Sequence, residues 1–382
     1  MLTNKFKINY SIGSVANGIK TDSFTFFLLF FYSNIIGLNP GLAGSAIFIA
    51  LCIDAVTDPL MGTISDRTST SLGRRHPYMM ISFIPMSLGY IFLFAPRQDW
   101  DMSQSDLFVW MTIFTVLTRI GMTLFDIPHR AFGGEVTKNY KERTILMSWR
   151  EMIGWVAGLS NAFLGYGIFF ASTPEYPQGQ LNPDAWFPFA VTGAIFMIIS
   201  VLYSSLSTKD EIKSLSKWSG SISLIDIIKE LKIAIGNRAF LIFFFGNLFL
   251  SLAWGLSNTL TLFVNTYFWE FEATQIKYFL PIYLFATLLA FYLTPRMVNR
   301  YDKRNIVLIC IAAVGILAPG PFIMYNLGLT PENGSLELVF FISSFLLILI
   351  TFNIVGIMVR DSMVGDIADE VCLLYTSDSA DE

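Results

Sequence analysis

The residues best suited to chemistry in this sequence are acidic side chains that interrupt apolar stretches. Asp54 and Asp58 stand four residues apart, so they share one face of a helix, with Thr57 beside them. A third carboxylate, Asp126, has Thr123 three residues before it. Two ionised carboxylates that close repel each other unless a proton or a cation lies between them. Hard oxygen ligands without histidine or cysteine suit an alkali cation better than a transition metal.

Membrane-spanning helices must position these acids. Of the 382 residues 54% are hydrophobic and only 14% are charged, whereas a soluble domain carries roughly 25% charged residues. This composition excludes a soluble enzyme, a disordered chain and a nucleic-acid-binding protein. One crossing of a bilayer needs about 20 apolar helical residues. Ten stretches meet that requirement, namely 10–34, 41–65, 78–96, 107–129, 146–170, 187–206, 239–266, 277–297, 306–326 and 337–359. The predicted fold class is an all-α polytopic membrane protein.

The loops between these stretches predict the orientation and the domains. Lys and Arg number 20 on the side of the N-terminus and only 2 on the other, which predicts a cytoplasmic N-terminus. The central loop, 207–238, follows six spans and separates an N-terminal bundle (1–206) from a C-terminal bundle of four helices (239–370). Apolar residues in this loop recur at helical spacing and predict an amphipathic helix on the membrane surface. They are Ile222, Leu224, Ile225, Ile228, Leu231 and Ile235.

Basic residues within the spans allow a second interpretation of the acids. An uncompensated charge at the centre of a span costs at least about 2.5–3.5 kcal/mol. Arg119 lies seven residues before Asp126 on the same helix face, and Arg150 and Lys20 lie in other spans. These bases could pair with the acids as a structural network. We favour a cation site and keep this ion-pair network as the alternative. His76 lies in a cytoplasmic loop and His129 at the end of the fourth span, and we expect them to be ordinary loop or boundary residues and not proton relays.

A faint internal repeat points to two related halves. Gly62-Thr-Ile-Ser-Asp66-Arg67 follows the second span, and a similar Arg- and Asp-rich loop, 295–304, follows the eighth. Duplicated six-helix halves are the architecture of major facilitator transporters. No Walker motif for binding ATP is present. Acids concentrated in one half and the absence of this motif favour coupling to an ion gradient.

At these residues the sequence resembles the glycoside–pentoside–hexuronide:cation symporters, the melibiose-permease branch of the major facilitator superfamily. The resemblance lies in Asp54-Ala-Val-Thr-Asp58-Pro-Leu-Met-Gly62, in Asp126-Ile-Pro128, and in Tyr140-Lys-Glu-Arg143-Thr144 followed by Arg150. It implies a major facilitator fold of which about ten of twelve helices are present. The positions that bind the coupling Na⁺, Li⁺ or H⁺ in that family correspond to Asp54, Asp58, Asp126, Thr57 and Thr123.

The resemblance also implies a substrate site, in which this sequence departs from the family's residues at two positions. Asp126 and Arg150 fall on sugar-contacting positions. The family's sugar-binding aspartate corresponds to Gly18, and Lys20 and Asp22, one turn along, are the candidates to replace it. The family's ring-stacking aromatic corresponds to Arg130. A sugar or glycoside is the expected substrate. The related sodium-dependent lysophospholipid symporters are the alternative, because Arg130 also suits a lipid phosphate.

The expected function is therefore secondary active transport in the cell inner membrane. We expect a monomer that binds a small-molecule substrate and a monovalent cation, contacts the lipid bilayer and no nucleic acid, is not an enzyme, and needs no cofactor. A non-transporting membrane sensor or scaffold is a less favoured alternative. In the family a basic element follows the position of Glu370, whereas residues 371–382 of this sequence contain no Lys or Arg. We therefore expect a non-native tail on a chain that lacks the last two spans.

Overall fold

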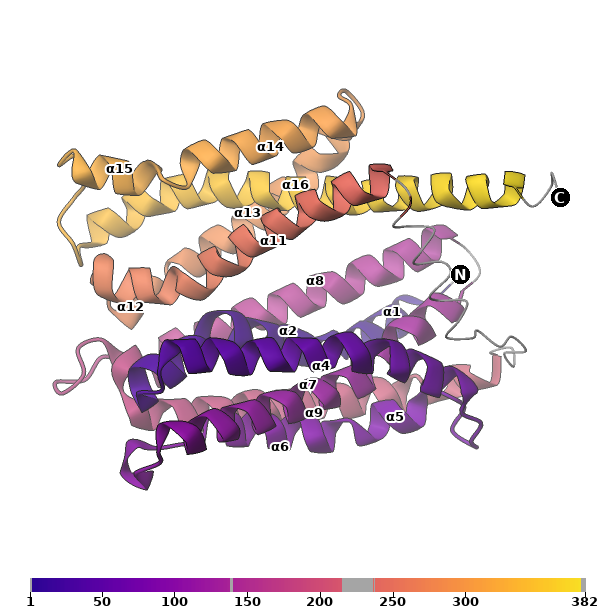
Figure 1. The fold of residues 1–382 in the computed structure, drawn as a ribbon, viewed down its shortest axis with the longest axis horizontal. Helices are drawn as coiled ribbons and strands as arrows, with labels where there is room; N and C mark the ends of the chain where they lie inside the picture. Colours follow the sequence, from indigo (N-terminus) through magenta and orange to yellow (C-terminus); the bar gives the residue numbers. More distant parts are fainter. Residues whose placement is uncertain (1, 138–139, 215–235, 237, 379–382) are drawn as a thin grey trace. The chain divides into compact units, whose positions relative to one another are not determined.

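The computed structural model describes residues 2–137, 140–214, 236 and 238–378. All regular elements within these residues are helices, which confirms the predicted all-α class (Figure 1). Eight of the described helices are long and apolar enough to cross a membrane. The chain is therefore a multi-pass membrane protein.

Each of the ten predicted spans falls on one helix or on a run of consecutive helices. The first span comprises α1 (Asn4–Ser11), α2 (Ser14–Asp22), η1 (Ser23–Phe27), α3 (Leu28–Phe30) and η2 (Phe31–Ile36). The next five are α4 (Pro40–Arg67), α5 (His76–Ile81) with α6 (Phe83–Leu93), α7 (Gln104–Glu135), α8 (Tyr140–Leu164) with η4 (Gly165–Phe169), and α9 (Trp186–Ser207). The last four are α11 (Arg238–Phe263) with η8 (Val264–Phe268), α12 (Ala273–Ile276) with α13 (Phe279–Val298), α14 (Lys303–Leu317) with α15 (Gly320–Asn326), and α16 (Leu336–Asp378).

The last helix is longer than its predicted span, which ends at residue 359. No proline interrupts the sequence from Leu336 to Asp378, and α16 continues through all of it. Residues 371–378 of the predicted tail therefore belong to this helix, and 379–382 lie outside the described residues.

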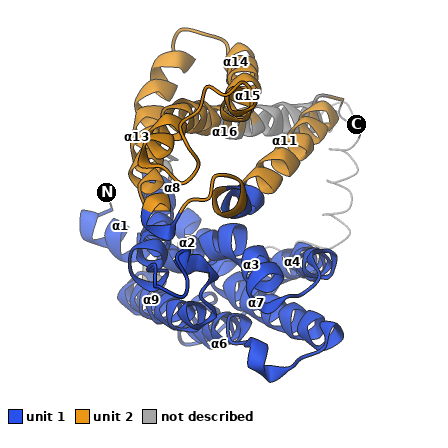
Figure 2. Cartoon of the chain, turned by 90° about the vertical axis from the view of Figure 1, so that its left-hand side faces the viewer, with its two compact units in different colours: residues 1–220, 258–264, 272–274 blue, residues 221–257, 265–271, 275–382 orange. Residues whose placement is uncertain are grey.

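The chain divides into two compact units (Figure 2). Unit 1 comprises Met1–Gly220, Asn258–Val264 and Glu272–Thr274, and unit 2 comprises Ser221–Ser257, Asn265–Phe271 and Gln275–Glu382. The predicted amphipathic helix around residues 222–235 lies outside the described residues.

Aromatic side chains fill the core of unit 1 near one end of its helices. The ring of Trp186, at the start of α9, lies 4.6 Å from the ring of Phe170 and 5.2 Å from that of Phe31, measured between centroids. Its indole nitrogen donates a hydrogen bond to the carbonyl of Gln180. These residues are buried, so this end of the bundle is closely packed.

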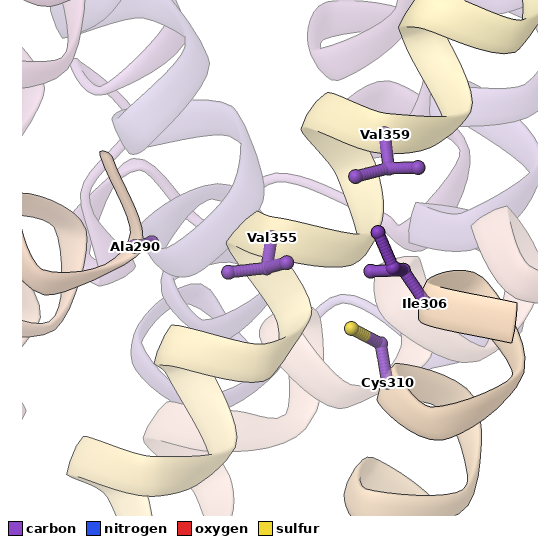
Figure 3. Close-up of a cluster of buried hydrophobic side chains, with 5 residues drawn as sticks. All are labelled: Ala290, Ile306, Cys310, Val355 and Val359. Carbon is purple, nitrogen blue, oxygen red and sulfur yellow. The ribbon is translucent and has the colours of Figure 1, made fainter. Parts of the chain in front are cut away.

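Small and branched side chains form the core of unit 2. Ala290 of α13 and Ile306 and Cys310 of α14 pack with Val355 and Val359 of α16 (Figure 3). The small Ala290 and Cys310 allow α16 to approach both neighbouring helices closely.

The two helices that carry the three aspartates begin with defined caps. Gly37 adopts a left-handed conformation (φ +85°), and the side chain of Asn39 then caps α4 by accepting from the amide of Gly41. Ser103 and Asp106 form a capping box at the start of α7. The side chain of Gln104 bonds both to the amide of Asn39, at 2.7 Å, and to the carbonyl of Gly37, at 2.8 Å. These bonds fix the register of α4 against α7.

Candidate cation and substrate site

Two polar pairs connect α4 to α7, one helical turn apart. Asp54 forms an ion pair with Arg119, and Asp58 accepts a hydrogen bond of 2.7 Å from the hydroxyl of Thr123. Both pairs join residues 65 positions apart, so the two helices present matching faces. The remaining predicted ligand, Thr57, donates from its hydroxyl to the backbone carbonyl of Asp54 at 3.5 Å. Its side chain therefore bonds to its own helix.

The ion pair between Asp54 and Arg119 is only partly satisfied. The second carboxylate oxygen of Asp54 and the Nε of Arg119 are buried and have no hydrogen-bond partner among the described residues. Arg119 also lies over the ring of Phe24, 5.3 Å from its centroid. Buried polar groups without partners are costly, so this pair is a place where a rearrangement or a ligand would be favourable.

The third aspartate, Asp126, is held by two arginines. Arg130, one turn along α7, donates from Nε at 2.6 Å, and Arg150 of α8 forms an ion pair with the other carboxylate oxygen. Glu151 completes the group, because its carboxylate accepts from Arg150 at 2.5 Å and lies 3.9 Å from Arg130. The negative charges of two acids therefore balance the positive charges of two arginines in this group.

His129 positions the guanidinium of Arg150. The ring of His129 stacks on the ring of Tyr10 with centroids 4.1 Å apart, and its Nδ1 accepts from Nε of Arg150 at 3.4 Å. The guanidinium can only donate, so the ring proton of His129 resides on Nε2, which donates to the carbonyl of Tyr10 at 3.0 Å. The expectation of an ordinary boundary residue is wrong for His129, because the packing of α7 against α1 and α8 buries it.

The other two predicted substrate residues lie in different surroundings. The amine of Lys20 lies over the ring of Phe24, 5.8 Å from its centroid, and so shares this ring with Arg119. Asp22 instead lies in a buried cluster with Asn161 of α8. The structure thus brings Lys20 near the α4–α7 pairs and separates Asp22 from Asp126.

The structure gives a physical reason for the glycine at position 18. A Cβ atom on Gly18 would lie 2.0 Å from the carbonyl oxygen of Gly154 and 3.1 Å from the backbone nitrogen of Gly158. Helices α2 and α8 are thus in backbone contact, as small residues permit in membrane bundles. No side chain of any kind fits at position 18 in this conformation.

The three aspartates do not converge on one point in this structure. Asp54 and Asp126 are each paired with arginine, as the alternative interpretation anticipated, and only Asp58 has a neutral partner. Within the described residues there is no group of three or more His, Cys, Asp or Glu placed to hold a metal ion. The expected convergence is therefore not seen, because arginines from α7 and α8 occupy two of the carboxylates. Cation binding by these residues stays a prediction.

Two acidic residues of importance escaped the sequence analysis. Glu151 is a further acid within the fifth span, and its position directly after Arg150 was the available signal. Glu135, at the end of α7, accepts from Arg74 at 2.6 Å and from Arg75 at 2.5 Å, and Arg75 also bonds to Asp66 at 2.9 Å. This network joins the end of α7 to the loop that follows α4.

Comparison with known proteins identifies the family of this chain. The model of the family described as "MFS/sugar transport protein" matches residues 9–381. YagG of Escherichia coli (strain K12), named provisionally as a glycoside/cation symporter, is 28% identical over 236 residues, which cover 62% of this chain and 48% of YagG. The isoprimeverose transporter of Lactiplantibacillus pentosus is 24% identical over 315 residues, 81% of this chain and 63% of that protein.

Another relative has a different named substrate. The sodium-dependent lysophosphatidylcholine symporter 1-A of Danio rerio is 31% identical over 179 residues, 45% of this chain and 32% of that protein. The chain thus spans less than two thirds of the length of each of these relatives.

A solved structure shares the fold. The inward open conformation of the xylose transporter XylE from E. coli superposes with a TM-score of 0.57 at 14% sequence identity, covering 94% of this chain and 88% of that one. This likeness in fold agrees with the family model, which matches residues 9–381. The chain belongs to the MFS/sugar transport protein family and has the major facilitator fold.

Proposed function

We propose that this protein is a cation-coupled symporter that moves a sugar or glycoside across the cell inner membrane by alternating access. Its family and the named glycoside/cation and isoprimeverose relatives support this proposal. The excess of Lys and Arg on one side supports a cytoplasmic N-terminus. In this proposal the protein acts as a monomer. It needs no organic cofactor, because the gradient of Na⁺, Li⁺ or H⁺ supplies the driving force.

The arrangement around Asp58 is the observation that carries this proposal. Asp58 lies in a membrane-spanning helix, and among the described residues no basic side chain lies within ion-pair distance of it. Its hydrogen-bond partner is the neutral hydroxyl of Thr123. A carboxylate and a hydroxyl from adjacent helices offer the hard oxygen ligands that an alkali cation prefers. The charge of such a cation would offset the cost of an unpaired acid at this depth.

Binding of the cation at Asp58 alters the neighbouring pairs. A positive charge near Asp58 competes with Arg119 for Asp54, whose second oxygen is buried and unpartnered. Substrate hydroxyls in turn engage Asp126 and Arg150, whose geometry His129 holds. Each ligand thereby raises the affinity for the other, as linkage requires. The occupied protein then exposes the site on the opposite side of the membrane.

A lysophospholipid is the second candidate substrate. Two observations favour it, the relative named as a lysophosphatidylcholine symporter and the half-exposed guanidinium of Arg130, which suits a phosphate. The hydroxyl-rich face of a sugar is better matched by the balanced acids and bases around Asp126. We therefore place the sugar first.

Uptake into proteoliposomes tests both candidates. Labelled glycosides and labelled lysophosphatidylcholine are offered with and without an inward Na⁺ or H⁺ gradient. The proposal predicts gradient-driven uptake of at least one glycoside, reduced to background by Asp58→Asn. Asp184→Asn, which alters an exposed loop acid, serves as the control and leaves uptake intact. Uptake of the lysolipid alone would replace the sugar assignment, and uptake of both classes that is independent of every gradient would reject symport.

A further inference from the structure

Asp22 is a buried acid that the proposed transport mechanism does not use. It ends α2 at the point where the π-helical turn η1 begins, and its side chain is 7% exposed. Its carboxylate accepts a hydrogen bond of 3.2 Å from the amide of Asn161 on α8. Its Cβ lies close to Gly158, where an added Cβ would meet it at 3.5 Å. The close packing of α2 on α8 therefore encloses it.

Among the residues that the structure describes, the polar groups around Asp22 are neutral. The amide of Asn161 also contacts the hydroxyl of Ser23 at 3.3 Å, and Ser23 in turn bonds to the phenol of Tyr90 on α6 at 2.6 Å. Tyr90 is thus the titratable side chain of this cluster besides Asp22 itself. On α9, Gly193 faces the ring of Tyr90.

The nearby basic side chains are engaged elsewhere. Lys20 and Arg119 lie over the ring of Phe24, and Arg150 is bound to Asp126 and Glu151. In the part of the chain that the structure describes, no basic nitrogen lies within 4.0 Å of the Asp22 carboxylate. Asp54 and Asp126, by contrast, each have an arginine beside them. Among the described residues Asp58 also lacks a basic partner, but it is only partly buried, whereas Asp22 is buried.

An isolated ionised carboxylate in such a place is strongly unfavourable, and the group neutralises instead by taking up a proton. We propose that Asp22 is a proton-binding site of this protein, distinct from the candidate cation site at Asp58. Asp22 is a neutral carboxylic acid in the conformation described, stabilised by Asn161. The proposed ligand is H⁺ and not Na⁺, because Asn161 directs the N–H groups of its amide, and not an oxygen ligand, at both Asp22 and Ser23.

Infrared spectroscopy of the purified chain tests this site. A protonated carboxylic acid has a carbonyl-stretching band well separated from that of a carboxylate, and labelling with ¹³C-aspartate assigns the band to aspartic acid. We expect an aspartic acid band near neutral pH that Asp22→Asn removes. Asp54→Asn is the matched control, since Asp54 also lies near the middle of its span but is paired with Arg119. It leaves the band unchanged.

Further arms keep the test decisive if Asp22→Asn fails to fold. In Asp58→Asn the band persists if it belongs to Asp22, and its loss there assigns it to Asp58 and overturns the proposal. Absence of any aspartic acid band in the wild type at neutral pH overturns it as well. Conversion of the Asp22 band into a carboxylate band on adding Na⁺ would make this a sodium site and also overturn it. These readouts are independent of transport, so a protein that moves no sugar would still show the band.

Discussion

The ion pair between Asp54 and Arg119 can be tested by a double-mutant cycle. Asp54→Asn leaves the Arg119 charge buried, and Arg119→Gln leaves the Asp54 carboxylate buried. Breaking a fully buried pair costs about 3–5 kcal/mol. The side chains are 20% and 11% exposed, so solvent offsets part of this and we expect about 2–3 kcal/mol for each single variant. The double variant leaves neither charge, so it is less destabilised than the sum of the singles by about 1–3 kcal/mol.

Reversible unfolding in mixed detergent micelles gives the four free energies of unfolding that the cycle requires. A matched control cycle uses Arg97 and Asp184, which form an ion pair of 2.9 Å at 58% and 74% exposure. Exposed pairs of this kind contribute about 0.2–1 kcal/mol. If the effects at Asp54 and Arg119 add to within about 0.5 kcal/mol, the pair does not stabilise the fold and the reasoning is refuted.

Three further substitutions test other contacts. Glu135→Gln leaves two loop arginines without their shared carboxylate and lowers the free energy of unfolding by about 2–4 kcal/mol; a midpoint equal to wild type would contradict this. Gly18→Ala forces a Cβ to within 2.0 Å of the Gly154 carbonyl and costs about 1–3 kcal/mol or more, so an unchanged melting temperature would show that α2 and α8 are not in contact. Thr123→Val removes the hydroxyl bonded to Asp58. We expect the dissociation constant for Na⁺ to rise roughly tenfold, a loss of about 1.4 kcal/mol of binding free energy. An unaltered affinity would exclude this hydroxyl as a ligand.

The spans were predictable from the sequence because their signal is local. A crossing helix needs only enough consecutive apolar residues, and each of the ten predicted stretches lies on helix. The end of α16 was not predictable in this way, because a helix can continue beyond the apolar stretch wherever no residue such as proline stops it. The π-helical turns of the first span left no comparable signal in composition.

The ion-pair and hydrogen-bond partners of the acids were much harder to predict from the sequence than the acids themselves. Spacing placed Asp54 and Asp58 on one face of a helix, but the register of α4 against α7 decides that the first meets an arginine and the second a threonine. That register depends on loop contacts made by Gln104, which no periodicity reveals. The contact of Gly18 with α8 is likewise a property of packing and not of sequence.

Equilibrium binding of radiolabelled Na⁺ to the purified chain tests the cation site most directly. Wild-type protein and the exposed-loop variant Asp184→Asn should bind Na⁺ in a saturable manner, and Asp58→Asn should abolish this binding while its thermal unfolding remains cooperative. Saturable Na⁺ binding of equal affinity in Asp58→Asn would contradict the assignment of the coupling ion to the α4–α7 face.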